Sequence, residues 1–315
     1  MQKDLSPILL FVYNRPQQTR KTLESLAKNT LADQSTLYIF SDGPADVEDL
    51  GNVSRIDEVR QLITEKKWCK EVVIYNSEKN KGLATSIIEG VTEKVNQYGK
   101  VIVLEDDLVT ARGFLEYMNA SLERYQLENR VMHISGFQFP IRVNPDHSAF
   151  FLPITSSWGW GTWKRAWDRF DPECIGYEKL KTDDDLRKKF DLNGTFLYSK
   201  MIIDQMETKN IDSWAIRWYW AVFKHNGLSL VPDKSLVLNN GYGKGATHTK
   251  GRNPFKIEFD ADYYVSSLPD KISVNEQHFL SLQNLYKKLY PAKISLVGRI
   301  IRKIRREIHA MLDRD

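Results

Sequence analysis

The chain has 315 residues, of which 42% are hydrophobic and 27% are charged, a composition typical of globular proteins. Two cysteines, Cys69 and Cys174, exclude a disulfide framework and a zinc site, so we expect two buried thiols in a reducing cytoplasm. No stretch approaches the roughly 20 apolar residues of a membrane helix, which predicts a protein that is neither secreted nor membrane-spanning.

The first half of the chain alternates short apolar runs with longer segments of helical periodicity. Four strands buried on both faces are expected in the apolar runs Ile8–Tyr13, Leu37–Ser41, Val72–Tyr75 and Val101–Leu104. Helices are expected between them, over residues 15–28, 54–66 and 83–97. This alternation predicts an α/β fold, Rossmann-like, with a mostly parallel sheet flanked by helices.

Polar side chains follow three of these four strands. Asn14 and Arg15 follow the first strand, Asp42 follows the second, and the acidic residues 105–107 follow the fourth. Parallel strands end at one edge of their sheet, and ligands bind at that edge in folds of this class. We therefore expect these three segments to converge on one site.

The three consecutive acids are the strongest chemical signal in the sequence. Glu105, Asp106 and Asp107 repel one another unless a cation or solvent compensates their charges. Their hard oxygen atoms suit Mg²⁺ or Mn²⁺, which would in turn neutralise a diphosphate. The alternative is a solvated acidic turn that caps a helix beginning near Ala111, although one acid would suffice for a cap.

The second half is rich in tryptophan, with seven of the eight between residues 158 and 220. Trp160, Trp163 and Trp167 recur at helical spacing, which favours a core position for Trp163 and Trp167. Trp158 and Trp160 could instead stack on the apolar face of a sugar ring.

A glycine-rich, polar and basic stretch over residues 239–251 predicts a long loop. It contains Lys244 and His248, which would lie near phosphate oxygens if the loop closed over a bound diphosphate. The alternative is a mobile loop without a role in binding.

Residues 293–315 contain seven basic and three acidic residues, so this tail carries the whole net charge of +4. Apolar residues recur every three or four positions from Ile294 to Leu312 and predict a C-terminal basic amphipathic helix. Residues 293–312 could bind an anionic membrane surface, which would make a cytoplasmic protein peripheral on the inner face of the membrane. They could instead dock on the body of the protein or on a second subunit.

Several motifs occur in an order that resembles one enzyme family. They are Val12-Tyr-Asn-Arg15 with Thr19 and Leu23, Phe40-Ser-Asp42, Val103-Leu-Glu-Asp-Asp107-Leu108 with Phe114-Leu-Glu-Tyr117, Trp158-Gly-Trp-Gly161, Asp212-Ser-Trp214 and Gly245-Ala-Thr-His248. From about Pro7 to His248 the series resembles GT-A glycosyltransferases, most closely the branch of N-acetylglucosaminyltransferase I and its bacterial relatives. An acidic triplet alone would be weak evidence, whereas the ordered series is specific.

The resemblance implies a GT-A fold, a nucleotide-sugar donor with UDP-sugars favoured, and Mn²⁺ or Mg²⁺ bound directly by Asp107. Glu105 and Asp106 would contact the sugar and ribose of the donor, and Asp42 its nucleobase. Further donor contacts would come from Arg15, Ser86 (where the family has a histidine), Gly159, Trp160, Gly161, Lys244 and His248.

Asp212 is the candidate catalytic base. An acceptor hydroxyl has to lose its proton as it attacks the anomeric carbon, and a carboxylate within hydrogen-bond reach can take that proton. The resemblance implies an inverting single displacement. Asp212 could instead, or in addition, cap a helix over residues 213–224. Asp204 and Asp185 are less favoured candidates for the base.

We therefore expect a glycosyltransferase domain over residues 1–290 and a tail over residues 291–315. The domain would comprise a nucleotide-sugar-binding half, residues 1–135, and an acceptor half, residues 136–290. The expected activity is transfer of a hexosyl or N-acetylhexosaminyl group to a glycan or lipid-linked glycan in bacterial surface polysaccharide synthesis. No nucleic-acid partner is expected.

Two other functions are alternatives to sugar transfer. A sugar nucleotidyltransferase shares this kind of sheet and uses Mg²⁺, but it normally carries a glycine-rich basic loop after the first strand, where this chain has Tyr13-Asn-Arg-Pro-Gln17. A non-catalytic carbohydrate-binding protein would need neither the three acids nor Asp212.

Overall fold

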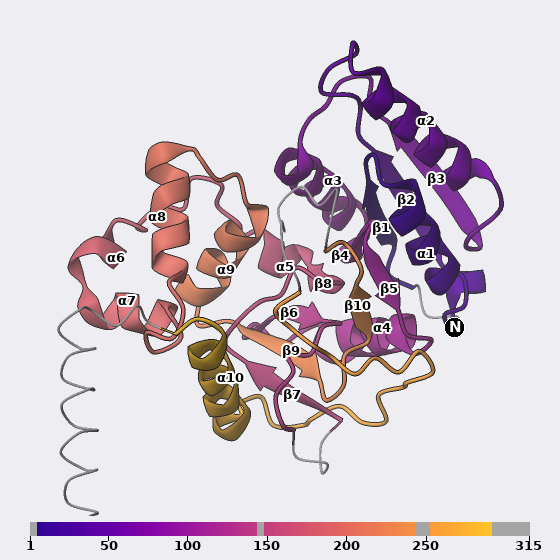
Figure 1. Cartoon of the computed structure of the whole chain (residues 1–315). Coiled ribbons are helices and arrows are strands. Elements are labelled where there is room, and N and C mark those ends of the chain that lie inside the picture. Colours follow the sequence, from indigo (N-terminus) through magenta and orange to yellow (C-terminus); the bar gives the residue numbers. More distant parts are fainter. Residues whose placement is uncertain (1–4, 144–147, 243–252, 292–315) are drawn as a thin grey trace, which may run out of the picture.

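The apolar runs of the first half form four neighbouring parallel strands in the computed structural model, which describes residues 5–143, 148–242 and 253–291. The strands are β1 (Ile8–Val12), β2 (Thr36–Ser41), β3 (Glu71–Asn76) and β4 (Lys100–Glu105). They alternate with α1 (Pro16–Leu26), α2 (Leu50–Thr64) and α3 (Leu83–Tyr98), as predicted (Figure 1). A single 3₁₀ turn, η1 (Ala32–Gln34), precedes β2. The strand order is β3-β2-β1-β4, so the chain returns past β1 before it forms β4.

Successive residues of a central strand face two different helix layers. In β1, Ile8, Leu10 and Val12 pack in one core with α1 and α2, whereas Leu9 and Phe11 pack in a second core with α3. All five side chains are at most 4% exposed. Side chains alternate across a strand, so a strand covered on both faces has to be apolar throughout.

Strand β3 is the exception to the predicted burial on both faces. It is the first strand of the sheet order and has a neighbour on one side only. Tyr75, near its end, is 39% exposed. The prediction was wrong here because an apolar run does not reveal whether its strand lies at the edge or in the centre of a sheet.

The second half of the chain extends the same sheet with mixed pairing. Strand β8 (Trp160–Trp163) lies antiparallel between β4 and β6 (Val131–Ser135), followed by β9 (Leu228–Pro232) and β7 (Ala149–Leu152). Across the described residues, four of the seven neighbouring pairs in this sheet are parallel, which confirms the predicted α/β class. One continuous sheet therefore runs through both halves of the expected domain.

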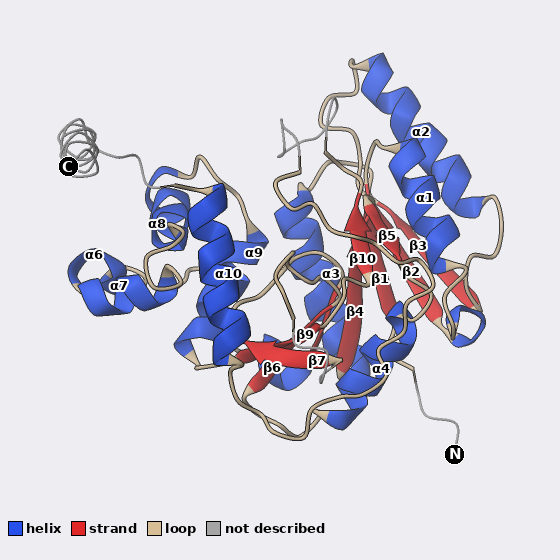
Figure 2. Cartoon of the chain, turned by 60° about the horizontal axis from the view of Figure 1, so that its bottom comes forward, coloured by secondary structure: helices blue, strands red, loops and turns tan. Residues whose placement is uncertain are grey.

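The remaining helices follow β4 in the chain. They are α4 (Phe114–Arg124), α5 (Lys164–Trp167), α6 (Lys179–Thr182), α7 (Asp184–Phe190), α8 (Tyr198–Thr208), α9 (Trp214–Lys224) and α10 (Glu276–Leu289). Helices α6 to α10 gather on the side of the molecule away from α1 and α2 (Figure 2). A separate antiparallel pair, β5 (Leu108–Thr110) and β10 (Val237–Asn239), connects the two halves.

The three tryptophans that recur at helical spacing do not lie on one helix, since two lie on a strand and the third lies on the helix that follows it. Trp160 and Trp163 are the first and last residues of β8, and α5 starts only at Lys164. The helical spacing of these tryptophans does not reflect a single helix, because β8 is followed directly by the short helix α5. Trp163 and Trp167 are 2% and 4% exposed, which confirms their predicted core positions.

Other predictions meet the structure only in part. Cys69 and Cys174 are both buried free thiols, as expected. None of the helices in the described ranges combines the length and the hydropathy that a membrane-spanning helix requires. Lys244, His248 and the amphipathic helix predicted over residues 293–312 lie outside the described residues.

Helix α3 approaches the sheet closely at Gly90. It lies over a stack of rings in which the centroids of Phe11 and Phe40 are 4.9 Å apart. A Cβ at position 90 would come within 2.9 Å of Phe11 Cζ and 3.2 Å of Phe40 Cζ. Glycine is therefore required by packing in the middle of this helix, although it disfavours the helix itself.

We expect Gly90→Ala to lower the free energy of unfolding by about 1–3 kcal/mol, because the added methyl group forces the helix and the rings apart. The matched control is Gly51→Ala in α2, where a Cβ would make only ordinary contacts of 3.5 Å or more. That change should leave stability unchanged or raise it by about 0.5–1 kcal/mol. Urea denaturation of both variants checks the difference, and equal effects would contradict the close packing at Gly90.

Candidate active site

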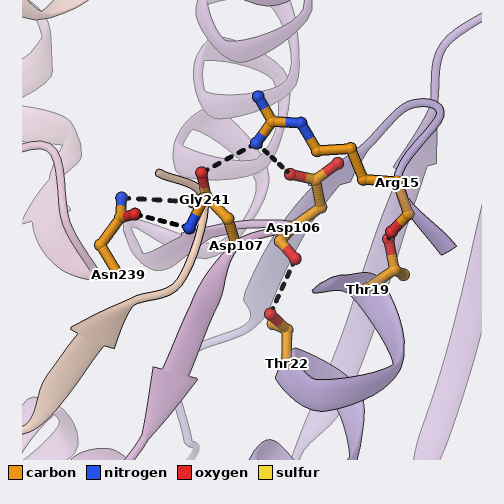
Figure 3. A network of polar contacts seen from close by, with 7 residues as sticks. All are labelled: Arg15, Thr19, Thr22, Asp106, Asp107, Asn239 and Gly241. Carbon is orange, nitrogen blue, oxygen red and sulfur yellow. Dashed lines mark hydrogen bonds and ion pairs between the residues drawn. The ribbon is translucent and has the colours of Figure 1, made fainter. Parts of the chain in front are cut away.

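The carboxyl ends of three parallel strands bring the predicted polar residues to one edge of the sheet. In the strand registers, Val12 of β1 lies opposite Ser41 of β2, and Phe11 lies opposite Glu105 of β4. Arg15 therefore emerges from β1 beside the acids that follow β4 (Figure 3). The strand order reverses at this position, which is where ligands bind in open α/β sheets.

Arg15 is ion-paired with two of the three acids. Its Nη1 donates to Asp107 Oδ2 at 2.9 Å and lies 3.6 Å from Asp106 Oδ1. The three side chains are only 12–16% exposed. Two hydroxyls of α1 fix the backbones, since Thr19 donates to Arg15 O at 2.8 Å and Thr22 donates to Asp106 O at 2.9 Å (Figure 3).

Burial raises the pKa of each of these acids. The pKa of Glu105 is raised well above its usual range, first by burial and then by Asp107 and Asp106. Burial, with the neighbouring Asp107, raises the pKa of Asp106 to about 7. The pKa of Asp107 is also raised by burial, although the Arg15 guanidinium acts in the opposite direction. One guanidinium thus compensates three carboxyl groups only partly, and the edge favours an additional cation.

The acids do not form the helix cap that was the alternative interpretation. Glu105 is the last residue of β4, and β5 begins at Leu108, directly after Asp107. The next helix, α4, begins at Phe114 with Gly113 as its N-cap. The acids lie between two strands, so a helix end does not account for them.

The chemistry of these oxygen donors fits a divalent cation that is shared with a ligand. Mg²⁺ usually takes only one or two protein carboxylates and completes its shell with water and phosphate oxygens. Among the described residues, no group of three or more His, Cys, Asp or Glu side chains is arranged as a metal cage. Asp107, which the family resemblance assigns to such a cation, lies beside the turn after β10.

A turn after β10 closes over Asp107, and the sequence analysis did not single it out. Asn239 Nδ2 lies 3.5 Å from Asp107 Oδ1, and the backbone N–H of Asn240 donates to Asp107 O at 2.9 Å. A Cβ at Gly241 would lie 1.9 Å from Asp107 Oδ2, so a side chain there would displace the carboxylate. The only sequence signal was the Asn-Asn-Gly tripeptide at the start of the predicted loop.

The Asn240 side chain is the most unusual polar group of the site. Both its Oδ1 and its Nδ2 are buried without a hydrogen-bond partner among the residues that the structure describes. An unpaired buried amide is destabilising by about 1–3 kcal/mol, so natural proteins keep few of them. Its position beside Asp107 makes Asn240 a candidate ligand-binding residue.

Asp42 holds the loop before α3. Its carboxylate accepts hydrogen bonds from the backbone N–H groups of Gly43, Lys81 and Gly82 at 2.9–3.1 Å. The turn role expected for Asp42 is thus present, and a contact with a nucleobase would have to share oxygens that are already bonded. Ser86 lies one turn into α3, where its N–H donates to Gly82 O at 3.0 Å.

Trp160 and the glycines beside it belong to the core. Trp160 is 0% exposed and stacks on Trp214 with ring centroids 4.9 Å apart. A Cβ at Gly159 or Gly161 would come within 2.8 Å or 3.1 Å of core atoms. The predicted contact between the Trp160 ring and the donor is therefore corrected: β8 lies inside the sheet, where both faces are covered. The two glycines are explained by packing.

Asp212 lies on the surface just before α9. Its side chain is 65% exposed and forms an ion pair with Arg217. The N-cap of α9 is Ser213, whose Oγ accepts a backbone N–H of the first turn at 3.4 Å, so the capping role considered for Asp212 is wrong. The less favoured candidates, Asp204 and Asp185, lie on α8 and α7.

Comparisons with known proteins give only weak similarity in fold. No family model and no curated protein matches the sequence. Residues 1–349 of S. aureus TarS match with a TM-score of 0.41 and 12% identity, covering 73% of this chain and 59% of that one. Mouse xyloside xylosyltransferase 1 matches with a TM-score of 0.37 and 14% identity, covering 72% and 84%. An apo UDP-glucose pyrophosphorylase matches with a TM-score of 0.36 and 9% identity, covering 72% and 90%. The match spans about three fifths of the TarS structure, and these scores do not decide between the activities named.

We expect Asp106→Asn to stabilise the protein at high pH and not at low pH. Because the pKa of Asp106 is raised to about 7, the folded state binds a proton that the unfolded state has lost above about pH 4. The stability of the wild type therefore falls, relative to the variant, as pH rises from about 4 to about 7. At pH 8 the variant should be more stable by about 2–4 kcal/mol.

Thermal and urea denaturation at pH 4 and pH 8, without added divalent cations, measure this difference. Asp204→Asn, at an exposed ion pair with Lys200 on α8, is the control and should change stability by less than about 1 kcal/mol at either pH. An equal gain in stability for Asp106→Asn at both pH values would contradict the claim that Arg15 compensates the three acids only partly.

Proposed function

We propose that this protein is a metal-dependent GT-A glycosyltransferase that moves a sugar from a nucleotide-sugar donor to a glycan acceptor. The observation that carries the proposal is the pairing of Arg15 with Asp106 and Asp107, where the strand order reverses. A partly compensated acidic edge at that position suits a divalent cation together with a diphosphate. The ordered motifs described above support the same activity.

Each residue of the edge has a role in this proposal. Asp107 would hold a divalent cation, whose positive charge would offset that of the diphosphate as the nucleoside diphosphate leaves. Arg15 exchanges part of its pairing with the acids for a donor phosphate or base, to which a guanidinium can bind in a bidentate manner. Asn240 gains hydrogen-bond partners from the donor or from a water of the cation shell. Glu105 and Asp106 contact the sugar and ribose.

Asp212 acts as the general base on the acceptor side. The acceptor oxygen attacks the anomeric carbon, the bond from that carbon to the diphosphate oxygen breaks, and the hydroxyl proton passes to the Asp212 carboxylate. A single displacement of this kind inverts the configuration at the anomeric carbon. Support comes from the position of Asp212 next to Ser213, which lines a pocket in the acceptor half.

The finer assignments depend on the order of motifs. These are a UDP-sugar as donor, the N-acetylglucosaminyltransferase I branch, and a role in bacterial surface polysaccharide synthesis with a glycan or lipid-linked glycan acceptor. Anchoring at an anionic membrane would depend on residues 293–312, outside the described part of the chain.

We expect Asp107→Asn to abolish the stabilisation of the protein by UDP with Mn²⁺ and to reduce sugar transfer at least 100-fold. The substitution keeps the shape of the side chain and removes the anionic ligand. A panel of nucleotide sugars with Mn²⁺, read as released nucleoside diphosphate, measures transfer, and thermal denaturation measures binding. The surface variant Asp168→Asn, at an exposed ion pair with Lys164, should behave as the wild type. Full activity of wild type in EDTA would contradict the metal, and release of pyrophosphate from a nucleoside triphosphate with a sugar phosphate would indicate a nucleotidyltransferase.

We expect Asp212→Asn to lower turnover by about 10²–10⁴-fold while donor binding changes less than about threefold, because the amide cannot accept the proton. Turnover at saturating donor and the donor Kd separate the two effects. The control is Arg217→Lys, which keeps a cation beside Asp212 and should leave turnover within about tenfold of wild type. Unchanged turnover together with a large loss of donor affinity would show that Asp212 is not the base.

A further inference from the structure

A pocket of about 200 Å³ lies in the second half of the molecule, between the loop before β8 and helices α8, α9 and α10. Its walls consist largely of aromatic rings, among them Phe137, Phe139, Trp158 and Phe255. The rings hold one another in place, since Trp158 lies edge-on to Phe137 at 4.4 Å and to Phe255 at 5.9 Å between centroids. Such a volume corresponds to about six or seven water molecules, the scale of a single sugar ring.

Hydroxyl groups complete the lining of this pocket. Thr155, Ser156 and Ser157 come from the loop before β8, and Ser213 comes from the start of α9. The Oγ atoms of Ser156 and Ser213 each accept a backbone N–H, at 3.3 Å and 3.4 Å, and each can donate its own proton to a ligand. Aromatic walls with a few hydroxyls match a pyranose, which has apolar C–H faces and a polar edge.

The pocket contrasts in charge with the acidic edge. None of the described residues that line it has a charged side chain. A carboxylate or phosphate placed among these rings would lose part of its hydration without gaining a counter-ion from the described lining residues, which is unfavourable. The lining therefore favours an uncharged ligand and disfavours both the diphosphate of a donor and an acidic sugar.

Two residues at the pocket, Trp158 and Ser213, relate it to the proposed reaction centre. On one side, the Trp158 ring lies edge-on to Tyr242 at 6.0 Å, and Tyr242 directly follows Gly241, which touches the Asp107 carboxylate. On the other side, Ser213 lines the pocket and directly follows Asp212. The pocket thus adjoins both the proposed donor edge and the proposed base.

We infer that this pocket binds one uncharged sugar ring of the acceptor, such as a hexose or an N-acetylhexosamine. That the bound sugar is the acceptor rests on the proposed function, whereas the selectivity for a neutral ring follows from the residues that line the pocket. Trp158 and the hydroxyls of the loop before β8 orient the ring, and Ser213 places it beside Asp212.

The test uses the full chain and measures binding separately from transfer. Saturation-transfer NMR and calorimetry compare the methyl glycosides of glucose, galactose and N-acetylglucosamine with methyl glucuronide, whose carboxylate is the only added charge. The blocking variant is Ala215→Leu, because Ala215 lines the pocket from α9 and extra carbons there fill it without removing core packing. The matched control is Ala120→Leu, which adds the same atoms at an exposed position of α4.

We expect at least one neutral glycoside to bind, the glucuronide to bind at least tenfold more weakly, and Ala215→Leu to weaken neutral binding at least tenfold. Ala120→Leu should match the wild type, and both variants should keep stabilisation by UDP with Mn²⁺. If Ala215→Leu does not fold, Thr155→Val removes one lining hydroxyl and should weaken binding about three- to tenfold.

Each contrary result identifies which claim fails. If the wild type binds no glycoside, or if neither pocket variant weakens binding, the inference that the pocket binds a sugar ring is wrong. The proposed function is still supported in that case if the protein binds UDP with Mn²⁺. Equal binding of the glucuronide overturns the selectivity for a neutral ring. If Ala215→Leu removes glycoside binding but the protein does not bind UDP with Mn²⁺, the pocket binds a sugar ring and the proposed glycosyltransferase function is wrong.

Discussion

The charge balance between Arg15 and the acids after β4 is the constraint on which this edge of the molecule depends. Three carboxyl groups are packed at the end of a central strand, where desolvation raises the pKa of each of them. A single guanidinium, 2.9 Å from Asp107, compensates them in part. The strand order β2-β1-β4 makes that contact possible, because it places the residues after β1 next to those after β4 although about 90 residues separate them. Strand β1, which leads to Arg15, is apolar throughout and lies between two helix layers.

The second half of the chain differs from this edge in chemistry, as the proposed transfer between two different substrates requires. The proposed donor edge is acidic and suits a cation with a diphosphate. The aromatic pocket next to it has no charged side chain among its described lining residues and suits a neutral ring. The turn Asn239–Gly241 and Tyr242 after it contact both sites, since Gly241 lies against the Asp107 carboxylate and the Tyr242 ring lies edge-on to Trp158. The same short segment contains the Asn240 carboxamide, which has no hydrogen-bond partner among the described residues.

Much of the first half was predictable because its signals are local. An apolar run between polar turns predicts a buried strand wherever both faces are covered, and the four predicted strands agree with β1 to β4 within one residue at each end. The signal was weaker in the second half. The spacing of Trp160, Trp163 and Trp167 suits a helix, yet the first two lie on β8 and only the third lies on α5. Helix α10 was not predicted, although Asn275 caps it through the N–H of His278 at 3.0 Å. Short strands such as β5 carry too few residues for a periodic pattern.

The sequence by itself determined the residues that follow the parallel strands, because strand ends in such a sheet meet at one edge regardless of the details of packing. Arg15 and the acids 105–107 were found in this way, and the structure brings them together. Tertiary structure alone decided which other residues join them. Asn240 comes from a segment more than 130 residues away and reaches Asp107 only through the pairing of β10 with β5. Trp160, which by composition could serve a sugar or the core, was assigned to the core by the position of β8 inside the sheet. Adjacency across a sheet depends on the order in which strands assemble, and no local pattern in the chain encodes that order.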